Sequence, residues 1–202
     1  MVVRVLGWSS MPAHSGLGTL QYHHEMLFGD ANVRPALVSD ARSIAMVHVE
    51  SSRTTYRGIL PDTHLAQFTL EKRERFWAEA LQKPEPRTVT LVGFDPDLGV
   101  LGFVSGSKER TGQLECDGEL YVIYLLPRAQ GQGLGTLLTK RFVHELRARG
   151  FCSMVVWVLA ANPFRRFYEK LGGQVIAEQS IERDGPTFLE IAYGWKDLRM
   201  FG

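Results

Sequence analysis

The stretch Gln130-Gly131-Gln132-Gly133-Leu134-Gly135 separates an apolar run from a long amphipathic segment. Residues 120–126, before it, are almost wholly apolar, as is typical of a central strand buried on both faces. After it, apolar residues recur on one face at the period of an α-helix: Leu134, Leu137, Leu138, Phe142 and Leu146. We therefore predict a buried strand, a glycine-rich loop and a helix, in that order.

Glycine-rich loops between a strand and a helix bind phosphate groups, because the first N–H groups of the helix and its dipole attract anions. A Walker loop requires Lys-Ser/Thr directly after its last glycine, whereas Leu134 and then Gly135-Thr136 follow Gly133 here. A dinucleotide-binding loop requires a third glycine where this chain has Thr136. The pattern that remains is Gln130-x-x-Gly133-x-Gly135, three residues after Pro127 at the end of the strand.

The rest of the chain alternates between strand and helix patterns. We predict strands at 32–36, 88–92, 100–105, 120–126, 154–159, 174–182 and 188–194. We predict helices after Asp40, at 63–81 with a break near Thr69, at 134–149, and from Asn162 to Leu171. This order indicates one α/β domain at 31–197, with a mixed sheet and helices on both faces. Residues 1–30 lack a sustained period, so we expect a disordered N-terminal extension, and 198–202 form a short C-terminal tail.

Composition excludes several classes of function. The 202 residues carry 23 Lys+Arg and 22 Asp+Glu, and a net charge of +1 argues against a nucleic-acid partner bound through counterion release. The two cysteines are too few for a disulfide scaffold, and no Cys/His spacing of a metal site surrounds them. No segment approaches the roughly 20 apolar residues of a membrane span, and the N-terminus lacks the pattern of a secretory signal. We expect a cytoplasmic protein without a metal, a nucleic-acid partner or a membrane partner.

Three motifs together carry a resemblance to a known family. Gln130-x-x-Gly133-x-Gly135 resembles the pyrophosphate-binding signature of the GNAT superfamily of acetyltransferases. Leu125-Leu126-Pro127 is similar to the end of that superfamily's fourth strand, and the segment 162–172 is similar to its Asn…Phe-Tyr-x-Lys-x-Gly element. The resemblance covers about residues 32–195. It implies a mixed, mostly antiparallel sheet with helices on both faces.

The resemblance also implies acetyl-CoA as co-substrate and places its binding residues. Backbone groups of Ile123 and Leu125 are implied to pair with the pantetheine arm, and the Leu125 N–H is our candidate donor to the oxyanion of the reaction. The implied pyrophosphate loop consists of Gln130, Gly131, Gln132, Gly133, Leu134, Gly135 and Thr136. Asn162 is implied to bond to the pantetheine or to a bound water, although it could equally cap the helix that follows it.

The catalytic candidates rest on the same resemblance. Tyr168 is the candidate acid that protonates the CoA thiolate; its alternative role is that of a core aromatic. The ribosomal-protein type of the superfamily has a catalytic Glu on the fifth strand, where this chain has Trp157. The histone type has one on the fourth strand, where this chain has Glu119, so Glu119 is the candidate base. Its alternative is an exposed strand-start residue, and Tyr124 and His48 are further candidate bases.

The function implied is transfer of an acetyl group from acetyl-CoA to a primary amine by direct attack in a ternary complex. The rival is a non-catalytic acyl-CoA sensor or partner-binding module on the same fold, but Glu119 and Tyr168 together favour an enzyme. The acceptor, a small-molecule or protein amine, has no signature in the region 50–80. Ser52, for example, stands where a related bacterial branch commonly has Trp. The sequence leaves a homodimer open.

Overall fold

The computed structural model of the protein describes residues 28–29 and 32–201. Of the predicted N-terminal extension it therefore describes only Phe28 and Gly29, and Phe28 packs partly buried against the main hydrophobic cluster. The rest of that prediction lies outside the described residues.

The described residues form one seven-stranded sheet, with the strand order β1-β2-β3-β4-β5-β7-β6. All neighbouring strands are antiparallel except β4 and β5, which are parallel. This confirms the predicted mixed, mostly antiparallel sheet. The strands are β1 (Val33–Pro35), β2 (Val89–Asp95), β3 (Gly99–Lys108), β4 (Gly118–Leu125), β5 (Met154–Leu159), β6 (Gln174–Glu182) and β7 (Thr187–Trp195).

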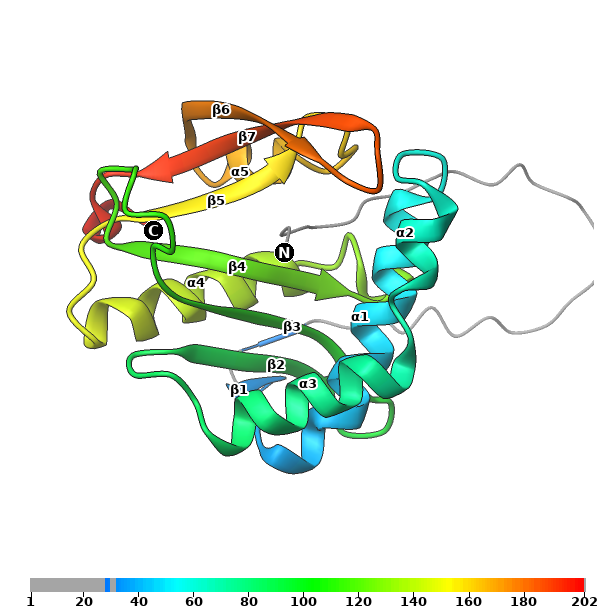
Figure 1. The fold of residues 1–202 in the computed structure, drawn as a ribbon. Helices are drawn as coiled ribbons and strands as arrows, with labels where there is room; N and C mark the ends of the chain where they lie inside the picture. Colours follow the sequence, from blue (N-terminus) through cyan, green and yellow to red (C-terminus); the bar gives the residue numbers. More distant parts are fainter. Residues whose placement is uncertain (1–27, 30–31, 202) are drawn as a thin grey trace, which may run out of the picture.

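Helices cover both faces of the sheet (Figure 1). They are α1 (Ala41–Tyr56), α2 (Asp62–Ala66), α3 (Leu70–Gln82), α4 (Leu134–Ala148) and α5 (Arg166–Lys170), with short 3-10 helices at Val38–Asp40, Pro127–Ala129 and Leu198–Met200. Two neighbours on β3 show which helices lie where. A Cβ at Gly102 would face Leu138 of α4, whereas the Phe103 ring contacts His48 of α1 and Trp77 of α3. Because successive residues of a strand point to opposite faces, α4 lies on one face and α1 with α3 on the other.

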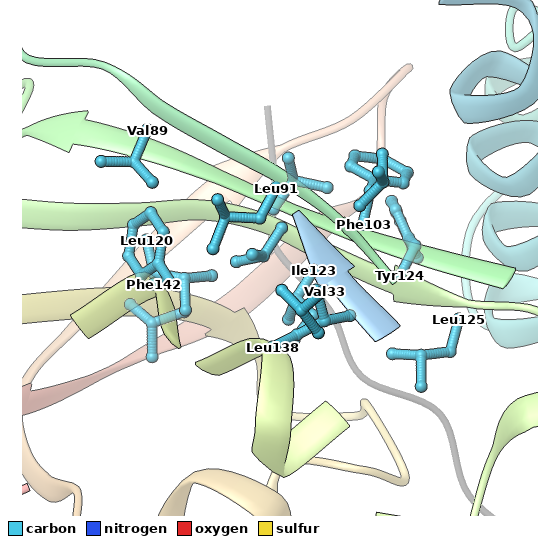
Figure 2. Packing of buried hydrophobic residues seen from close by; sticks show 14 of the residues in the cluster. Val33, Val89, Leu91, Phe103, Leu120, Ile123, Tyr124, Leu125, Leu138 and Phe142 are labelled. Carbon is cyan, nitrogen blue, oxygen red and sulfur yellow. The ribbon is translucent and has the colours of Figure 1, made fainter. Parts of the chain in front are cut away.

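The core follows from the apolar stripe of α4. Leu134, Leu138, Phe142 and Leu146 are fully buried, as their spacing predicts, and Figure 2 shows Leu138 and Phe142 among strand residues that include Leu120 and Ile123. Phe103 and Tyr124 point to the opposite face. Burial of such side chains stabilises the fold by about 1.5–3 kcal/mol each.

Strand β4 contains a bulge and separates from β5 toward its end. Ser105 pairs with Val122 but the next residue, Gly106, pairs with Leu120, so Tyr121 is an extra residue and β4 is bulged there. The parallel pairing of β4 with β5 consists of Gly118 with Met154 and Glu119 with Val155. Beyond these pairs the two strands diverge (Figure 1).

Three element boundaries refine the sequence predictions. The predicted break near Thr69 is present, since Thr69 Oγ1 accepts a hydrogen bond from the Lys72 N–H and caps α3. The predicted helix from Asn162 is regular only from Arg166, because the preceding residues form tighter i→i+3 turns. Residues of the predicted C-terminal tail pack on the domain: Leu198 is fully buried, and the Phe201 ring lies 5.8 Å from that of Trp195.

Candidate functional site

The end of β4 exposes backbone groups at the divergence from β5. The Leu126 N–H donates to the Leu101 carbonyl of β3, and Leu125 pairs with Gly102. In an antiparallel ladder, residues alternate between bonding to the partner strand and pointing away from it. Leu125 and Ile123 therefore direct their N–H groups away from β3, toward the β5 side. This is the geometry that the predicted oxyanion donor and pantetheine-binding groups require.

The glycine loop forms an anion site at the start of α4. Gly131 and Gly133 have φ of +71° and +86°, a left-handed conformation that glycine adopts without steric cost. Gly133 is the N-cap, and the Leu137 N–H is the first to bond back to it. The N–H groups of Leu134, Gly135 and Thr136 therefore have no partner within their own helix, and together with the dipole they favour a bound phosphate.

A cavity of about 400 Å³ opens beside this loop. It is lined by Leu125, Gln130, Gly131, Gly133, Gly135, Thr136, Pro163, Phe164, Arg166, Phe167 and Lys170. The loop residues were predicted, but the two cations from α5 were not. Arg166 and Lys170 are four residues apart and so share one helix face, a spacing that the sequence already displays. A cavity with backbone donors, a helix N-terminus and two cations fits the pyrophosphate of CoA.

Gln130 connects the loop to β4. Its Nε2 donates to the Leu125 carbonyl oxygen at 3.0 Å, and Ser51 Oγ of α1 donates to the same oxygen at 2.9 Å. The backbone that carries the Leu125 N–H is thus held from the cofactor loop and from α1. Ser52, the next residue, donates to Tyr124 Oη at 3.0 Å. The sequence did not predict these roles for the serines.

Asn162 has a double role close to the end of β5. Its Oδ1 accepts from the Phe164 N–H at 2.9 Å, a bond within the turn before α5; the N-cap of the regular helix is Arg165 and not Asn162 as predicted. Its Nδ2 donates to Tyr56 Oη at 3.2 Å, at the end of α1. The side chain is 2% exposed. Asn162 therefore joins the turn before α5 to the helix on the opposite side of the site, and its predicted bond to the pantetheine remains a prediction.

Tyr168 is fully buried on α5, under the β5–β7 part of the sheet. Its ring lies 5.9 Å from that of Tyr193, with 27° between the planes, and 5.5 Å from that of Phe167. Phe167 also lines the cavity beside the glycine loop. The burial of Tyr168 matches the core-aromatic alternative, and its predicted role as the acid remains a prediction.

The geometry of Glu119 argues against the predicted role as base. Its carboxylate accepts hydrogen bonds from the Arg110 backbone N–H and from Nε and an Nη of the same arginine. Its side chain is 1% exposed, and it lies where β4 and β5 are still paired. Leu125 is six residues further, about 20 Å along the strand at roughly 3.3 Å per residue. We therefore infer that Glu119 holds the Arg110 side chain in place.

The arginine side of this pair is also constrained. Burial works to lower the pKa of the Arg110 guanidinium, but the bonds to Glu119 outweigh it, and the net pKa is raised. The guanidinium lies 4.3 Å from the Tyr121 ring centre, over the bulge. Both residues line a second cavity of about 660 Å³ between α3 and the sheet, with none of the cofactor-loop residues in its wall. By holding Arg110 in place, Glu119 thus stabilises the wall of this second cavity.

His48 is packed rather than poised to take a proton. Its Nδ1 accepts a hydrogen bond from Trp77 Nε1 at 3.2 Å, and it is 2% exposed among aromatic rings. Burial, with a smaller contribution from Arg73, lowers the pKa of His48 to about 3. A histidine with so low a pKa is a weak base at neutral pH. Of the alternatives, Tyr124 lies nearest the site, because it precedes Leu125.

The described residues contain no group of three or more His, Cys, Asp or Glu side chains arranged for a metal ion. Within the same part of the chain, no helix combines the length and the apolar character that crossing a membrane requires.

Comparison with known proteins identifies relatives of this chain. The family model described as FR47-like protein matches residues 100–181, which span β4, the loop and α5. An uncharacterized N-acetyltransferase, YuaI of Bacillus subtilis, is 38% identical over 166 residues, 82% of this chain and 93% of that protein. The mycothiol acetyltransferase of Rhodococcus jostii is 29% identical over 145 residues, but the match spans only 47% of that enzyme.

The fold is also shared with a solved structure. The acetyltransferase YncA of Salmonella typhimurium, solved with its cofactor acetyl-CoA, superposes with a TM-score of 0.62 over 82% of this chain and 92% of that protein, at 22% identity.

Proposed function

Because the chain belongs to the GNAT superfamily of acetyltransferases, we propose that it transfers the acetyl group of acetyl-CoA to a primary amine by direct attack. The observation that carries this proposal is the continuous path from the glycine loop to the diverging end of β4. Gln130 links the two, since it belongs to the loop and bonds to the Leu125 carbonyl. The loop and α4 would hold the pyrophosphate, and the edge of β4 would hold the thioester.

The steps of the acetyl transfer can be assigned to individual groups of the protein. The neutral amine nitrogen first forms a bond to the thioester carbon, and the bond from that carbon to sulfur then breaks. The Leu125 N–H would stabilise the oxyanion that develops between these events. Tyr168 would give its phenolic proton to the departing thiolate. It would regain a proton from the attacking nitrogen, which must lose a second proton to become the neutral amide. The structure of α5 supports this role, because it fixes the ring next to the wall of the cofactor cavity.

The amine must also lose a proton. An alkylammonium with a pKa of about 10.4 is almost wholly protonated at neutral pH. It must lose a proton before its nitrogen has a lone pair that can attack the thioester. Glu119 is held by Arg110 far from Leu125, and His48 is a weak base. We therefore propose that this proton leaves through water or through Tyr124, at the open edge of β4.

The test is a panel of primary amines, comprising polyamines, aminoglycosides, amino acids and peptide N-termini, offered with acetyl-CoA. Free thiol is measured as it is released. We expect release that depends on the amine for at least one class, in the reducing conditions of a cytoplasm. Tight CoA binding without amine-dependent release in any class would instead indicate a non-catalytic acyl-CoA-binding module.

A further inference from the structure

A buried carboxylate on β7 has one oxygen with a hydrogen-bond partner and one without a partner among the described residues. The Glu190 residue is 3% exposed, and its Oε2 accepts a hydrogen bond from Gln179 Nε2 of β6 at 2.8 Å. Its Oε1 is buried and has no hydrogen-bond partner in the described part of the chain. A carboxylate oxygen in that situation costs free energy unless a donor reaches it.

The strand register places this carboxylate beside the proposed reaction centre. Glu190 pairs with Leu159, the last residue of β5. Glu119 pairs with Val155, and the bulge at Tyr121 adds one residue to β4. Four further residues on β5 therefore correspond to five on β4, which puts Tyr124 level with Leu159. Glu190 is therefore one strand beyond the point where β5 has parted from the cofactor-binding end of β4.

The side of the sheet follows from Leu159. Residues directly opposite in an antiparallel pair point to the same face, so Glu190 shares the face of Leu159. Leu159 packs with Tyr56 at the end of α1 and with Leu65 of α2. Tyr168 packs on Tyr193, which lies three residues along β7 from Glu190 and so on the other face. The proposed acid and this carboxylate thus flank the sheet from opposite sides.

A second polar atom on this face also lacks a partner. Trp157 pairs with Ala192, two residues from Glu190 on β7, so the indole and the carboxylate are on one face. The Nε1 of Trp157 is buried without a hydrogen-bond partner in the region that the structure describes. One face of the sheet therefore carries a buried acceptor and a buried donor that have no hydrogen-bond partner among the described residues. A polar ligand can bond to both atoms, whereas apolar side chains can bond to neither.

We propose that the Glu190 carboxylate binds the ammonium group of the acceptor, which approaches from the α1–α2 face of the sheet. The inference rests on the proposed acetyl transfer. It narrows the acceptor to amines that are cationic when they bind, and it favours those that also carry an oxygen acceptor for Trp157 Nε1. An ammonium supplies both the donor and the positive charge that Oε1 needs, and charge-assisted bonds of this kind are strong.

Two CoA thioethers test this without knowledge of the natural acceptor. S-(2-aminoethyl)-CoA projects an ammonium just beyond the position of the acetyl carbon, and S-propyl-CoA carries a methyl group in its place. Calorimetry on the wild type should give about tenfold or more tighter binding of the aminoethyl compound. In Glu190→Gln this preference should vanish while the affinity for S-propyl-CoA stays unchanged. Glu178→Gln, which neutralises an exposed carboxylate on β6, should behave as the wild type.

The outcomes separate the two proposals. Equal preference for the aminoethyl compound in the wild type and in Glu190→Gln overturns the role of Glu190, and so does a wild type with no preference. Failure of the wild type to bind either thioether overturns the proposed function itself. Since glutamine has the volume of glutamate and can keep the contact with Gln179, unchanged S-propyl-CoA affinity also shows that the variant is folded.

Discussion

Gln130 Nε2 donates a hydrogen bond to the carbonyl oxygen of Leu125 at 3.0 Å, and this bond joins the predicted phosphate-binding loop to the strand that we propose to hold the thioester. The two halves of the proposed cofactor site are therefore coupled through one side chain. We expect a change in the loop to affect the backbone at Leu125, whose N–H is the predicted oxyanion donor.

Gln130→Ala should weaken CoA binding by roughly three- to tenfold, the effect of one neutral hydrogen bond in a partly buried site. Calorimetry with CoA measures this directly. Gln113→Ala, in the exposed β3–β4 loop, is the matched control and should bind CoA as the wild type does. Unchanged affinity in Gln130→Ala would show that Ser51 alone holds the Leu125 carbonyl.

Gly133→Val should abolish CoA binding and leave the fold intact. A Cβ at this position meets no atom within 4 Å, so the cost to folding is the left-handed conformation alone, about 1–2 kcal/mol. The branched side chain would nevertheless project into open space at a residue that lines the cavity proposed to bind CoA. Gly99→Val carries the same strain in a distant hairpin turn, with φ of +76°, and should keep CoA affinity. Loss of binding in both variants would indicate a global effect.

Tyr168→Phe should reduce kcat by roughly 10²–10⁴-fold with little change in the acetyl-CoA KM, because the lost proton donor acts only late in the reaction. The phenyl ring can keep its stacking on Tyr193. Tyr193→Phe removes a neighbouring hydroxyl that bonds to Glu169 and should keep kcat within a few-fold. Wild-type kcat in Tyr168→Phe would leave Tyr168 as a core aromatic.

The sequence predicted those parts of the fold that local pattern determines. The stripe of Leu134, Leu138 and Phe142 and the left-handed Gly133 follow from spacing and from the conformational range of glycine. The position of the glycine loop at the start of α4 could therefore be predicted from the order of residues along the chain.

The pairs that shape the rest of the site could not be predicted in this way. The bond between Asn162 and Tyr56 spans 106 residues, and no periodicity links them. Nothing in the order of residues along β7 indicates that Glu190 is buried, and only its 3% exposure and its pairing with Leu159 in the structure reveal it. Glu119 was assigned by its position along the strand, whereas the partner that decides its role, Arg110, lies across an irregular loop.

Glu119→Gln should leave the pH dependence of kcat/KM intact, including its acidic limb, because the carboxylate is paired with Arg110 away from Leu125. It should instead lower the free energy of unfolding by about 1–3 kcal/mol, since a half-buried guanidinium loses its charged partner. A pH series and denaturant unfolding on the same preparation separate these effects. Loss of the acidic limb with unchanged stability would restore Glu119 as the base.

His48 should make the protein less stable as the pH falls below about 6.5. Its pKa is 6.5 when unfolded and about 3 when folded, so between these values the unfolded state binds the proton and the folded state does not. The stability contributed by neutral His48 is complete above the unfolded pKa and is lost as pH decreases toward the folded pKa. The full loss is on the order of 5 kcal/mol.

Denaturant unfolding at pH 7 and pH 4 measures this in the wild type and in His48→Asn, whose amide oxygen can still accept from Trp77 Nε1. The variant will be less stable at both values because its smaller side chain leaves a cavity, so the informative quantity is the difference between the two pH values. That difference should shrink in His48→Asn and stay unchanged in His144→Asn, where the imidazole is exposed on α4. Equal pH dependence in all three proteins would mean that His48 is protonated as readily in the folded state as in the unfolded one.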